Sequence, residues 1–414
     1  MSPPSDAEDA TLTVARLSLL GDGVTEGPAG PVYVPRSLPG EVVTGAIAGD
    51  RIAAPKIVTP SPDRVAAPCP HFRRCGGCRL MHAADGFVAA WKAERVRGAL
   101  ARAGLAAEVG APVTSPPGSR RRAVLAGRKT KKGAQLGFHV AGGTEIVAIP
   151  DCRLLRPEIM AALPHLEAIT RIAAPRGAEI ALHVTQGPAG LDLAITGAKP
   201  FDREAMLALA PLGAEFARIT WNGETALQQS PPYQLFGGVR VVPPPGAFLQ
   251  ATAEGEAALV AAVTAAVAGA GRIVDLFAGC GTFSFPAAAI APVQAVEGEA
   301  PQVAALAAGA RHAPGLKAVD AVRRDLFRAP LTSDELAGFD TAVIDPPRAG
   351  AAAQVAEIAA STLRRVAFVS CDPGTFARDA ATLVAAGFAM GPVMVVDQFR
   401  WSPHVELFAR FDRG

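Results

Sequence analysis

The chain has 414 residues, of which 50% are hydrophobic and 19% are charged. This length and apolar content suffice for two or three buried cores and exclude a chain that is disordered throughout. No run of about 18 uncharged apolar residues predicts a membrane span, and the polar, acidic first ten residues lack the basic and apolar regions of a signal peptide. We therefore expect a cytoplasmic protein without membrane attachment, and we also expect it to be monomeric.

The net charge of +2 hides a strongly basic block. Residues 71–132 contain fourteen Lys and Arg residues but only three acids, which gives this block a net charge of +11 and leaves −9 for the rest of the chain. Such asymmetry indicates an anionic partner, although solvated helix faces would produce the same pattern.

The N-terminal region alternates short β-rich runs with turn signals. Candidate strands occupy residues 12–17, 31–35 and 41–47, and Gly21-Asp-Gly23 and Leu38-Pro-Gly40 are typical of turns. Several short strands in fewer than sixty residues predict a small OB-like β-barrel over residues 1–62, a fold that often holds nucleic acid.

A central α+β domain is predicted over residues 63–249, after a linker at residues 61–68. A helix is expected over about residues 86–103, because Phe87, Trp91 and Val96 have helical spacing. The expected strands lie near residues 122–126, 145–149, 179–185 and 190–195.

Four cysteines fall within this central region, namely Cys69, Cys75, Cys78 and Cys152. Disulfides are not expected in a reducing compartment, and four thiolates suit either a zinc ion or an iron–sulfur cluster. The three-plus-one spacing differs from the paired C-x-x-C of zinc ribbons, but the residues alone leave zinc, a cluster and no metal open. Basic runs at 120–122 and 128–132 lie between these cysteines and are expected to contact phosphates.

Strand–helix alternation begins after Pro243-Pro-Pro-Gly246. After a helix over residues 252–269, the candidate strands are residues 272–277, 293–297, 341–345 and 366–370. This alternation predicts an α/β domain over residues 250–414, built on a doubly wound parallel sheet. Two final β runs, 393–396 and 404–411, have too little chain between them for a crossover and should pair antiparallel.

A nucleotide site is predicted at the carboxyl edge of this sheet. Asp275-Leu-Phe-Ala-Gly-Cys-Gly281 is a strand that runs into a glycine-rich turn, where the backbone can approach a ligand closely. Glu297 ends the next candidate strand, where a carboxylate can accept both ribose hydroxyl hydrogens. Asp325 and Asp345 lie at further strand ends or loops, and all three are expected on the same edge.

Cys371 follows another strand of this edge, directly before the turn-forming Asp372-Pro-Gly. Glu406 lies on one of the last β runs, where His404 would share its face of the strand. A thiol and a nearby base form a minimal set for covalent catalysis. Taken alone, a cysteine at a strand end is more often a small buried residue.

In their joint order, the motifs of this chain resemble the bacterial RNA uridine-5-methyltransferases, and in particular the iron–sulfur-containing branch that acts on 23S ribosomal RNA. The resemblance covers nearly the whole chain. The motifs that carry it are Cys69-x5-Cys75-Gly-Gly-Cys78, Ser119-Arg-Arg-Arg122, Cys152-Arg-Leu-Leu155, Gly246-Ala-Phe-Leu-Gln250, Asp275-Leu-Phe-Ala-Gly-Cys-Gly281, Asp345-Pro-Pro-Arg348, Ser370-Cys-Asp-Pro-Gly-Thr375 and His404-Val-Glu406.

The resemblance implies a class I methyltransferase that uses S-adenosylmethionine (SAM), with a TRAM-type barrel at its N-terminus and RNA as its partner. It implies that Cys371 is the nucleophile and Glu406 the base. It also implies a [4Fe–4S] cluster, rather than zinc, on Cys69, Cys75, Cys78 and Cys152. The residues that it places against SAM are Gln250, Phe277, Thr282, Glu297, Asp325 and Asp345.

Several alternatives stay open at this point. Asp345-Pro-Pro also occurs in amino-group methyltransferases, but Arg348 stands where those enzymes usually carry an aromatic residue. Ser370, rather than proline, precedes Cys371, which favours uracil over cytosine. The loop from Phe399 to Pro403 departs from the family's usual sequence. Transfer RNA is an alternative substrate, and a non-catalytic iron–sulfur RNA-binding protein is an alternative function.

Overall fold

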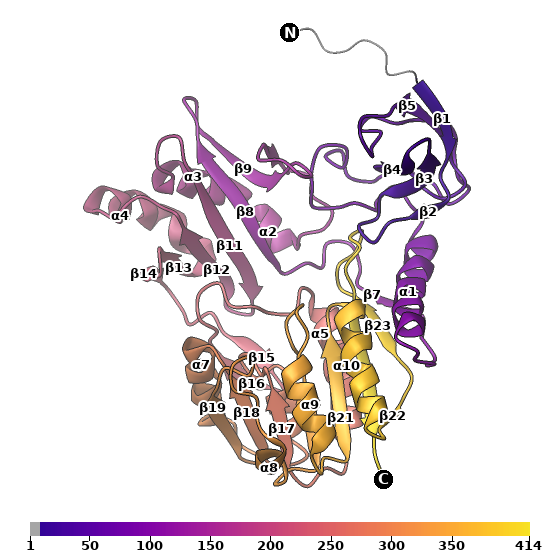
Figure 1. Cartoon of the computed structure of the whole chain (residues 1–414). Helices are drawn as coiled ribbons and strands as arrows, with labels where there is room; N and C mark the ends of the chain where they lie inside the picture. The colour runs from indigo at the N-terminus through magenta and orange to yellow at the C-terminus, as the bar shows by residue number, and fades with distance from the viewer. Residues whose placement is uncertain (1–8) are drawn as a thin grey trace.

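In the computed structural model, which describes residues 9–414, six short strands at the N-terminus form two three-stranded antiparallel sheets (Figure 1). The sheets are β1-β5-β6 and β2-β3-β4, and they share a core that includes Val14, Val34 and Ile52. Strands β3 and β6 were not predicted; β3 is a short Gly-Val-Thr-Glu-Gly segment with a glycine at each end. The strands are β1 (Asp9–Thr13), β2 (Arg16–Leu17), β3 (Gly23–Gly27), β4 (Gly30–Val34), β5 (Val42–Ala46) and β6 (Lys56–Thr59).

The segment at residues 61–68, which we predicted as a linker, is attached to these sheets. Arg64 Nη2 donates to Glu41 Oε2 at 2.7 Å, and Glu41 is fully buried. A buried carboxylate needs such a partner. This segment is therefore bound to the N-terminal sheets rather than being a free linker.

Helix α1 (Asp85–Arg102) confirms the helix expected over residues 86–103. It packs on α10 (Pro373–Ala385), and Val96 and Leu100 join a core of the C-terminal sheet. Strand β7 (Val113–Thr114) adds an edge to that same sheet by pairing with β23 (Met394–Asp397). The segment between the cysteines and the central sheet thus lies against the C-terminal part of the chain. The predicted boundaries at residues 62 and 249 stay predictions.

The central part is a seven-stranded sheet in the order β10-β9-β8-β11-β12-β13-β14. Leu125, Leu182 and Leu193 come from three neighbouring strands, β8, β11 and β12. They lie in one core with Ile159 of α2 and Leu166 of α3. The predicted strands are present, with β9, β13 and β14 in addition. The elements are β8 (Arg122–Lys129), β9 (Ala134–His139), β10 (Ile146–Ala148), α2 (Pro157–Ala161), α3 (Leu163–Ala173), β11 (Glu179–Gly187), β12 (Gly190–Thr196), α4 (Arg203–Leu209), η1 (Ala210–Glu215), β13 (Phe216–Trp221) and β14 (Glu224–Gln228).

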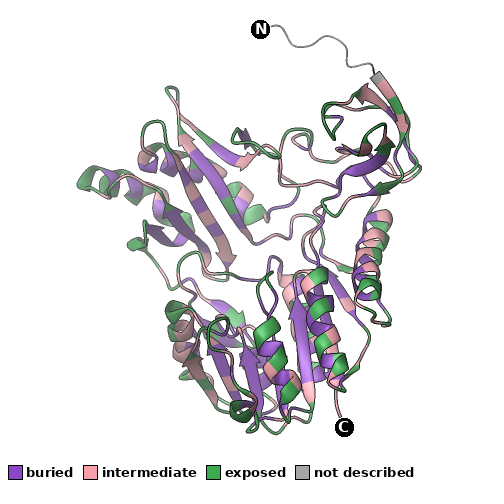
Figure 2. Cartoon of the chain, viewed as in Figure 1, coloured by how far each residue is buried: buried purple, intermediate pink, exposed green. Residues whose placement is uncertain are grey.

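The C-terminal part is a nine-stranded sheet with helices on both faces, and its strands are largely buried (Figure 2). Strands β19-β18-β17-β20-β21 are parallel, as predicted. Strand β24 pairs antiparallel with β21 and with β23, which confirms the antiparallel pairing expected for the last two runs. Strand β19 was not predicted, because it is an edge strand with no fully buried residue. Among residues 9–414, no helix has the length and apolar character needed to cross a membrane.

The remaining elements surround this sheet, and the hairpin β15–β16 packs on α7 through β16. They are β15 (Gln234–Phe236), β16 (Val239–Val241), α5 (Ala253–Ala266), β17 (Ile273–Leu276), α6 (Ser284–Ala288), β18 (Val293–Glu297), α7 (Ala300–Ala310), β19 (Val319–Arg323), α8 (Ser333–Leu336), β20 (Thr341–Ile344), α9 (Ala352–Ala360), β21 (Arg365–Ser370), β22 (Ala389–Met390) and β24 (Glu406–Asp412).

Candidate functional site

A pocket of about 1110 Å³ lies where the three parts of the chain meet. Leu20 of the β2–β3 turn, Arg79 beside the cysteines and Arg122 of β8 form part of its wall. Much of the remaining wall comes from the carboxyl edge of the parallel strands and from the loop over residues 399–404. Small-molecule pockets usually measure about 300–1000 Å³. The pocket therefore has room for a nucleotide-sized ligand together with a second group.

The glycine-rich turn after β17 forms one wall of this pocket. Gly281 has φ +95, and a Cβ there would lie 2.5 Å from Cε2 of Phe285, so only glycine fits without rearrangement. Phe277 has φ +62, a conformation that is costly for a non-glycine residue and that clusters at functional sites. Gly279 N donates to Glu297 Oε2 at 3.0 Å, which fixes the carboxylate at the end of β18 against the turn.

Two further acids line the pocket from neighbouring strand ends. Asp345 follows β20 and accepts a hydrogen bond from Gln250 Nε2 at 3.5 Å, and burial raises the pKa of Asp345 to about 7. Asp325 lies after β19 and accepts from the backbone of Phe327, whose ring packs on that of Phe277. All the residues that the sequence placed against SAM therefore line one pocket: Gln250, Phe277, Thr282, Glu297, Asp325 and Asp345.

The pairing of β21 with β24 sets Cys371 beside Glu406. Ser370 is paired with Leu407 in this antiparallel register, so the next positions along the two strands are Cys371 and Glu406. Both line the pocket, and Glu406 is only 2% exposed. The Asp372 side chain caps α10 by accepting hydrogen bonds from the backbone N–H groups of Gly374 and Thr375. This cap fixes the turn that follows Cys371.

The environment of this pair disfavours charge on both groups. Burial raises the pKa of Cys371 to about 12, and the Glu406 and Asp345 carboxylates contribute to the shift. Burial and the Asp345 carboxylate raise the pKa of Glu406 to about 8. Without ligands, the thiol is therefore protonated near neutral pH, and the carboxyl group is largely protonated as well.

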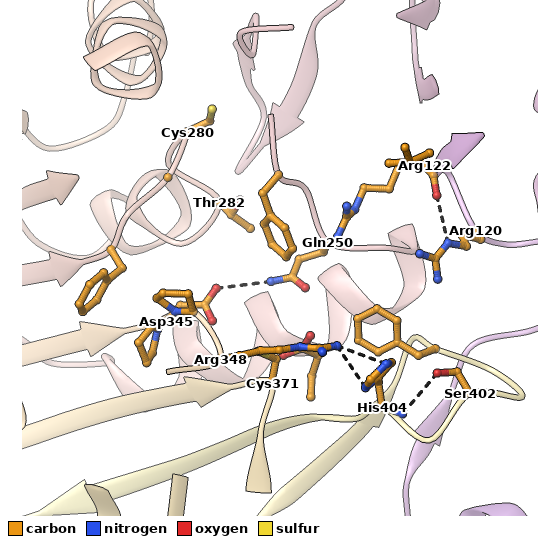
Figure 3. A pocket seen from close by; sticks show the side chains of 18 of the residues that line it. Arg120, Arg122, Gln250, Cys280, Thr282, Asp345, Arg348, Cys371, Ser402 and His404 are labelled. Carbon is orange, nitrogen blue, oxygen red and sulfur yellow. Dashed lines mark hydrogen bonds between the residues drawn. The ribbon is translucent and has the colours of Figure 1, made fainter. Parts of the chain in front are cut away.

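His404 does not share a strand with Glu406, as we had expected. Strand β24 begins at Glu406, and His404 lies in the preceding loop, where Arg348 Nη2 approaches its Nδ1 at 3.1 Å (Figure 3). Both residues nevertheless line the pocket. Burial and the Arg348 cation lower the pKa of His404 to about 4. His404 is thus a neutral hydrogen-bonding group at neutral pH rather than a cation.

The structure adds pocket residues that sequence reasoning missed. Phe248 packs under the Arg122 guanidinium at 4.4 Å, and Phe399 lies 5.9 Å from that of Arg120. Gln398, directly after β23, does not line the pocket itself but donates hydrogen bonds to Gln250 and Glu406, which do. No local signal in the sequence predicts these aromatic pairs, because each phenylalanine lies more than 100 residues from its arginine. Gln398 belongs to none of the motifs that the sequence analysis identified, and it directly precedes the loop that departs from the family pattern.

The four cysteines Cys69, Cys75, Cys78 and Cys152 line one small cavity. Burial and the other three thiols raise the pKa of Cys78. Gly77, Phe138 and Leu154 line both this cavity and the large pocket, so the two are neighbours. Within residues 9–414, no group of three His, Cys, Asp or Glu side chains is placed to hold a metal ion. The structure thus brings the predicted ligands together, while the cluster itself stays a prediction.

The parallel sheet, its glycine-rich turn and the antiparallel last strands define a class I SAM-dependent methyltransferase. The fold matches the structure of Pyrococcus abyssi tRNA (uracil-54, C5)-methyltransferase in complex with S-adenosyl-L-homocysteine, with a TM-score of 0.76 at 22% identity, over 97% of this chain and 99% of that one. Residues 244–410 match the family described as tRNA (Uracil-5-)-methyltransferase.

Relatives that match over nearly their whole length identify the family more closely. An uncharacterized RNA methyltransferase of Caulobacter vibrioides is 45% identical over 97% of this chain and 99% of its own length. The 23S rRNA (uracil(1939)-C(5))-methyltransferase RlmD of Cronobacter sakazakii is 32% identical over 98% of this chain and 96% of its own. The chain belongs to the RNA (uracil-5-)-methyltransferase family, which confirms the resemblance that its motifs indicated.

Proposed function

We propose that the protein methylates carbon 5 of a specific uridine in 23S ribosomal RNA through a covalent bond between Cys371 and carbon 6 of the uracil. The observation that carries this proposal is the β21–β24 register, which sets Cys371 beside Glu406 in the pocket that also holds the residues expected to bind SAM. The cytoplasmic location and the monomeric state stay predictions.

The proposed chemistry begins when the Cys371 thiol loses its proton to solvent. The thiolate bonds to carbon 6, and the electron pair of the C5=C6 bond moves onto carbon 5 and the adjacent carbonyl. Bound SAM supplies a methyl group on a positively charged sulfur; carbon 5 bonds to this methyl group while the methyl–sulfur bond breaks. The Glu406 carboxylate then takes the carbon 5 proton, the C5=C6 bond re-forms, and the bond from sulfur to carbon 6 breaks.

The raised pKa values of the free pocket fit this sequence of events. A protonated thiol is a poor nucleophile. Because the pKa of Cys371 stays high despite the Arg348 cation, its activation needs a further positive charge beside it. SAM carries such a charge on its sulfur, close to where the thiol must act. An opposite charge within about 4–6 Å favours the ionised form of an acid. The proposal thus ties activation of Cys371 to occupancy by the methyl donor.

We propose 23S ribosomal RNA as the substrate because the Cronobacter relative, named for that activity, aligns with 98% of this chain. Transfer RNA is the alternative; its support, the Pyrococcus structure, is a likeness of fold. Mapping 5-methyluridine by mass spectrometry in RNA from cells with and without this protein separates the two. A new methyluridine in tRNA alone would overturn the ribosomal assignment.

A basic groove on the central sheet supports an RNA partner. Lys129, Lys131 and Lys132 of the β8–β9 hairpin line it together with Arg171 of α3 and Lys199. One acid, Glu204, lies in the same groove. This excess of cations suits the phosphate backbone, which gives affinity that depends on salt but not on sequence. The groove extends the RNA surface beyond the pocket in which the uracil would react.

We further propose that Cys69, Cys75, Cys78 and Cys152 hold a [4Fe–4S] cluster. The support is that all four side chains line one cavity with an apolar wall, next to the large pocket. Bound there, the cluster would tie the segment before α1 to the central sheet. Anaerobically purified protein should show iron–sulfur absorption in the visible range, which Cys152→Ala should remove. Colourless protein with bound zinc would contradict the proposal.

The decisive experiment for the reaction is covalent trapping with 5-fluorouridine RNA. Fluorine cannot leave carbon 5 as a proton does, so the methylated adduct should persist and shift the protein on a denaturing gel. Cys371→Ala and Cys371→Ser should both abolish the adduct while keeping the thermal midpoint and SAM binding of the parent. An adduct that survives in these variants would remove Cys371 from the reaction.

A further inference from the structure

Gln398 is a buried amide that links two residues of the reaction pocket, Gln250 and Glu406. It follows Asp397, the last residue of β23, and is 1% exposed. Its neighbours come from two distant segments, the start of α5 and the start of β24. No motif in the sequence singled it out.

All four hydrogen-bonding positions of the Gln398 amide are used. Its Oε1 accepts from Ala251 N at 2.6 Å and from Thr252 N at 3.4 Å. Its Nε2 donates to Gln250 Oε1 at 2.5 Å and to Glu406 Oε1 at 3.1 Å. An amide has two acceptor positions and two donor hydrogens, so its orientation is determined completely, and a rotation by 180° would break every one of these bonds.

The backbone that carries Gln398 is also held in place. Asp397 pairs with Lys92 of α1 at 2.5 Å, and both side chains are essentially fully buried. Asp397 also accepts from Phe399 N at 3.1 Å, and Lys92 donates to the carbonyl of Phe399. Residues on both sides of Gln398 therefore have little freedom, and the amide acts from a fixed point.

From this geometry we propose that Gln398 is a positioning residue that holds Glu406 and Gln250 in fixed relation to each other, so that the base which takes the carbon 5 proton stays aligned with the methyl donor. The proposal rests on the function proposed above. It assigns Gln398 to the proton-removal step and not to the attack by Cys371, because its contacts run to the carboxylate and to Gln250.

The charges around Glu406 predict how the loss of Gln398 would change its titration. Asp345 after β20 raises the pKa of Glu406, whereas the hydrogen bond from Gln398, Arg122 of β8 and Arg348 lower it. Cys371, directly after β21, is neutral near pH 7. Removing the Gln398 donor leaves the carboxylate with less compensation for its burial. The base should then ionise only at higher pH.

The test compares Gln398→Met, which keeps the volume but removes the amide, with the parent enzyme. Release of tritium from RNA containing [5-³H]uridine measures proton removal across pH 6–10. We expect a loss of about tenfold or more at pH 7, with the acidic limb of the profile displaced upward by about one pH unit, since one pKa unit is a tenfold change in the ionised fraction. Trapping of 5-fluorouridine RNA, which needs no proton removal, should persist.

A second variant, Gln398→Glu, keeps an acceptor for Ala251 N and replaces the amide donor to Glu406 by a second titratable acid. It should displace the profile further than Gln398→Met, because it adds an acid beside the base, and it carries the test if Gln398→Met does not fold. A profile of unchanged shape, or unchanged rates, would overturn the proposal. Failure of the parent enzyme itself to trap 5-fluorouridine RNA would instead overturn the proposed function, so the two failures are distinguishable.

Discussion

Asp345→Asn should stabilise the ligand-free protein at pH 8 while weakening its binding of SAM. Burial raises the pKa of Asp345 from 3.8 to about 7. An acid whose pKa is raised on folding stabilises the fold below its unfolded pKa, and this contribution is lost as the pH rises through the folded pKa. Asparagine has nearly the same shape and never carries the charge, so it removes this penalty.

The magnitude follows from the shift. A rise of about three pKa units corresponds to about 4 kcal/mol at pH 8, since each unit is worth about 1.4 kcal/mol. Asp345 keeps partial contact with the pocket, and water there screens part of this cost. The new amide hydrogens also need partners, at a cost of about 1–3 kcal/mol if unmet. We therefore expect a net gain of about 1–2 kcal/mol, or roughly 2–8 °C in the thermal midpoint.

The assay is thermal unfolding of parent and variant at pH 4 and pH 8 without ligand, followed by calorimetric titration with SAM. The gain should be present at pH 8 and absent at pH 4, where Asp345 is largely protonated, and SAM affinity should fall tenfold or more. Equal stabilisation at both pH values, or destabilisation at pH 8, would show that burial does not penalise this carboxylate and would refute the reasoning.

Three further predictions concern the turn, the thiol and the groove. Gly281→Ala should weaken SAM binding and lower the thermal midpoint more than Gly269→Ala. Both glycines have positive φ, but only the Cβ at Gly281 would meet Phe285, whereas the Cβ at Gly269 would meet open space. Equal effects would assign the cost to the backbone conformation alone. Alkylation of Cys371 at pH 8, followed by peptide mass spectrometry, should be about tenfold faster with SAM than with S-adenosylhomocysteine, which fills the same site without the positive sulfur; equal rates would contradict activation by charge. Replacing the three lysines of the basic groove by glutamine should reduce the slope of log affinity against log salt by about 2–3 and leave turnover of saturating RNA unchanged; an unaltered slope would exclude the groove from binding.

The sequence by itself determined the strand ends of the C-terminal sheet and the residue types that stand on them. Asp345, Glu297 and Cys371 were predicted as neighbours because parallel strands present their carboxyl ends at one edge. The glycine-rich turn was likewise predicted from local chemistry, since a positive φ such as that of Gly281 favours glycine whatever surrounds it. These features depend on residues close together in the chain.

Tertiary structure decided what depends on segments far apart. That β24 pairs with β21 in the register that sets Glu406 beside Cys371 follows from strand order and packing, which no local pattern encodes. The same holds for Gln398, whose partners lie about 150 residues earlier and eight residues later. Helix α1 was predicted correctly as a helix, but its packing on the C-terminal core was not predicted. The spacing of apolar residues indicates which face of a helix is buried but not which element packs against that face.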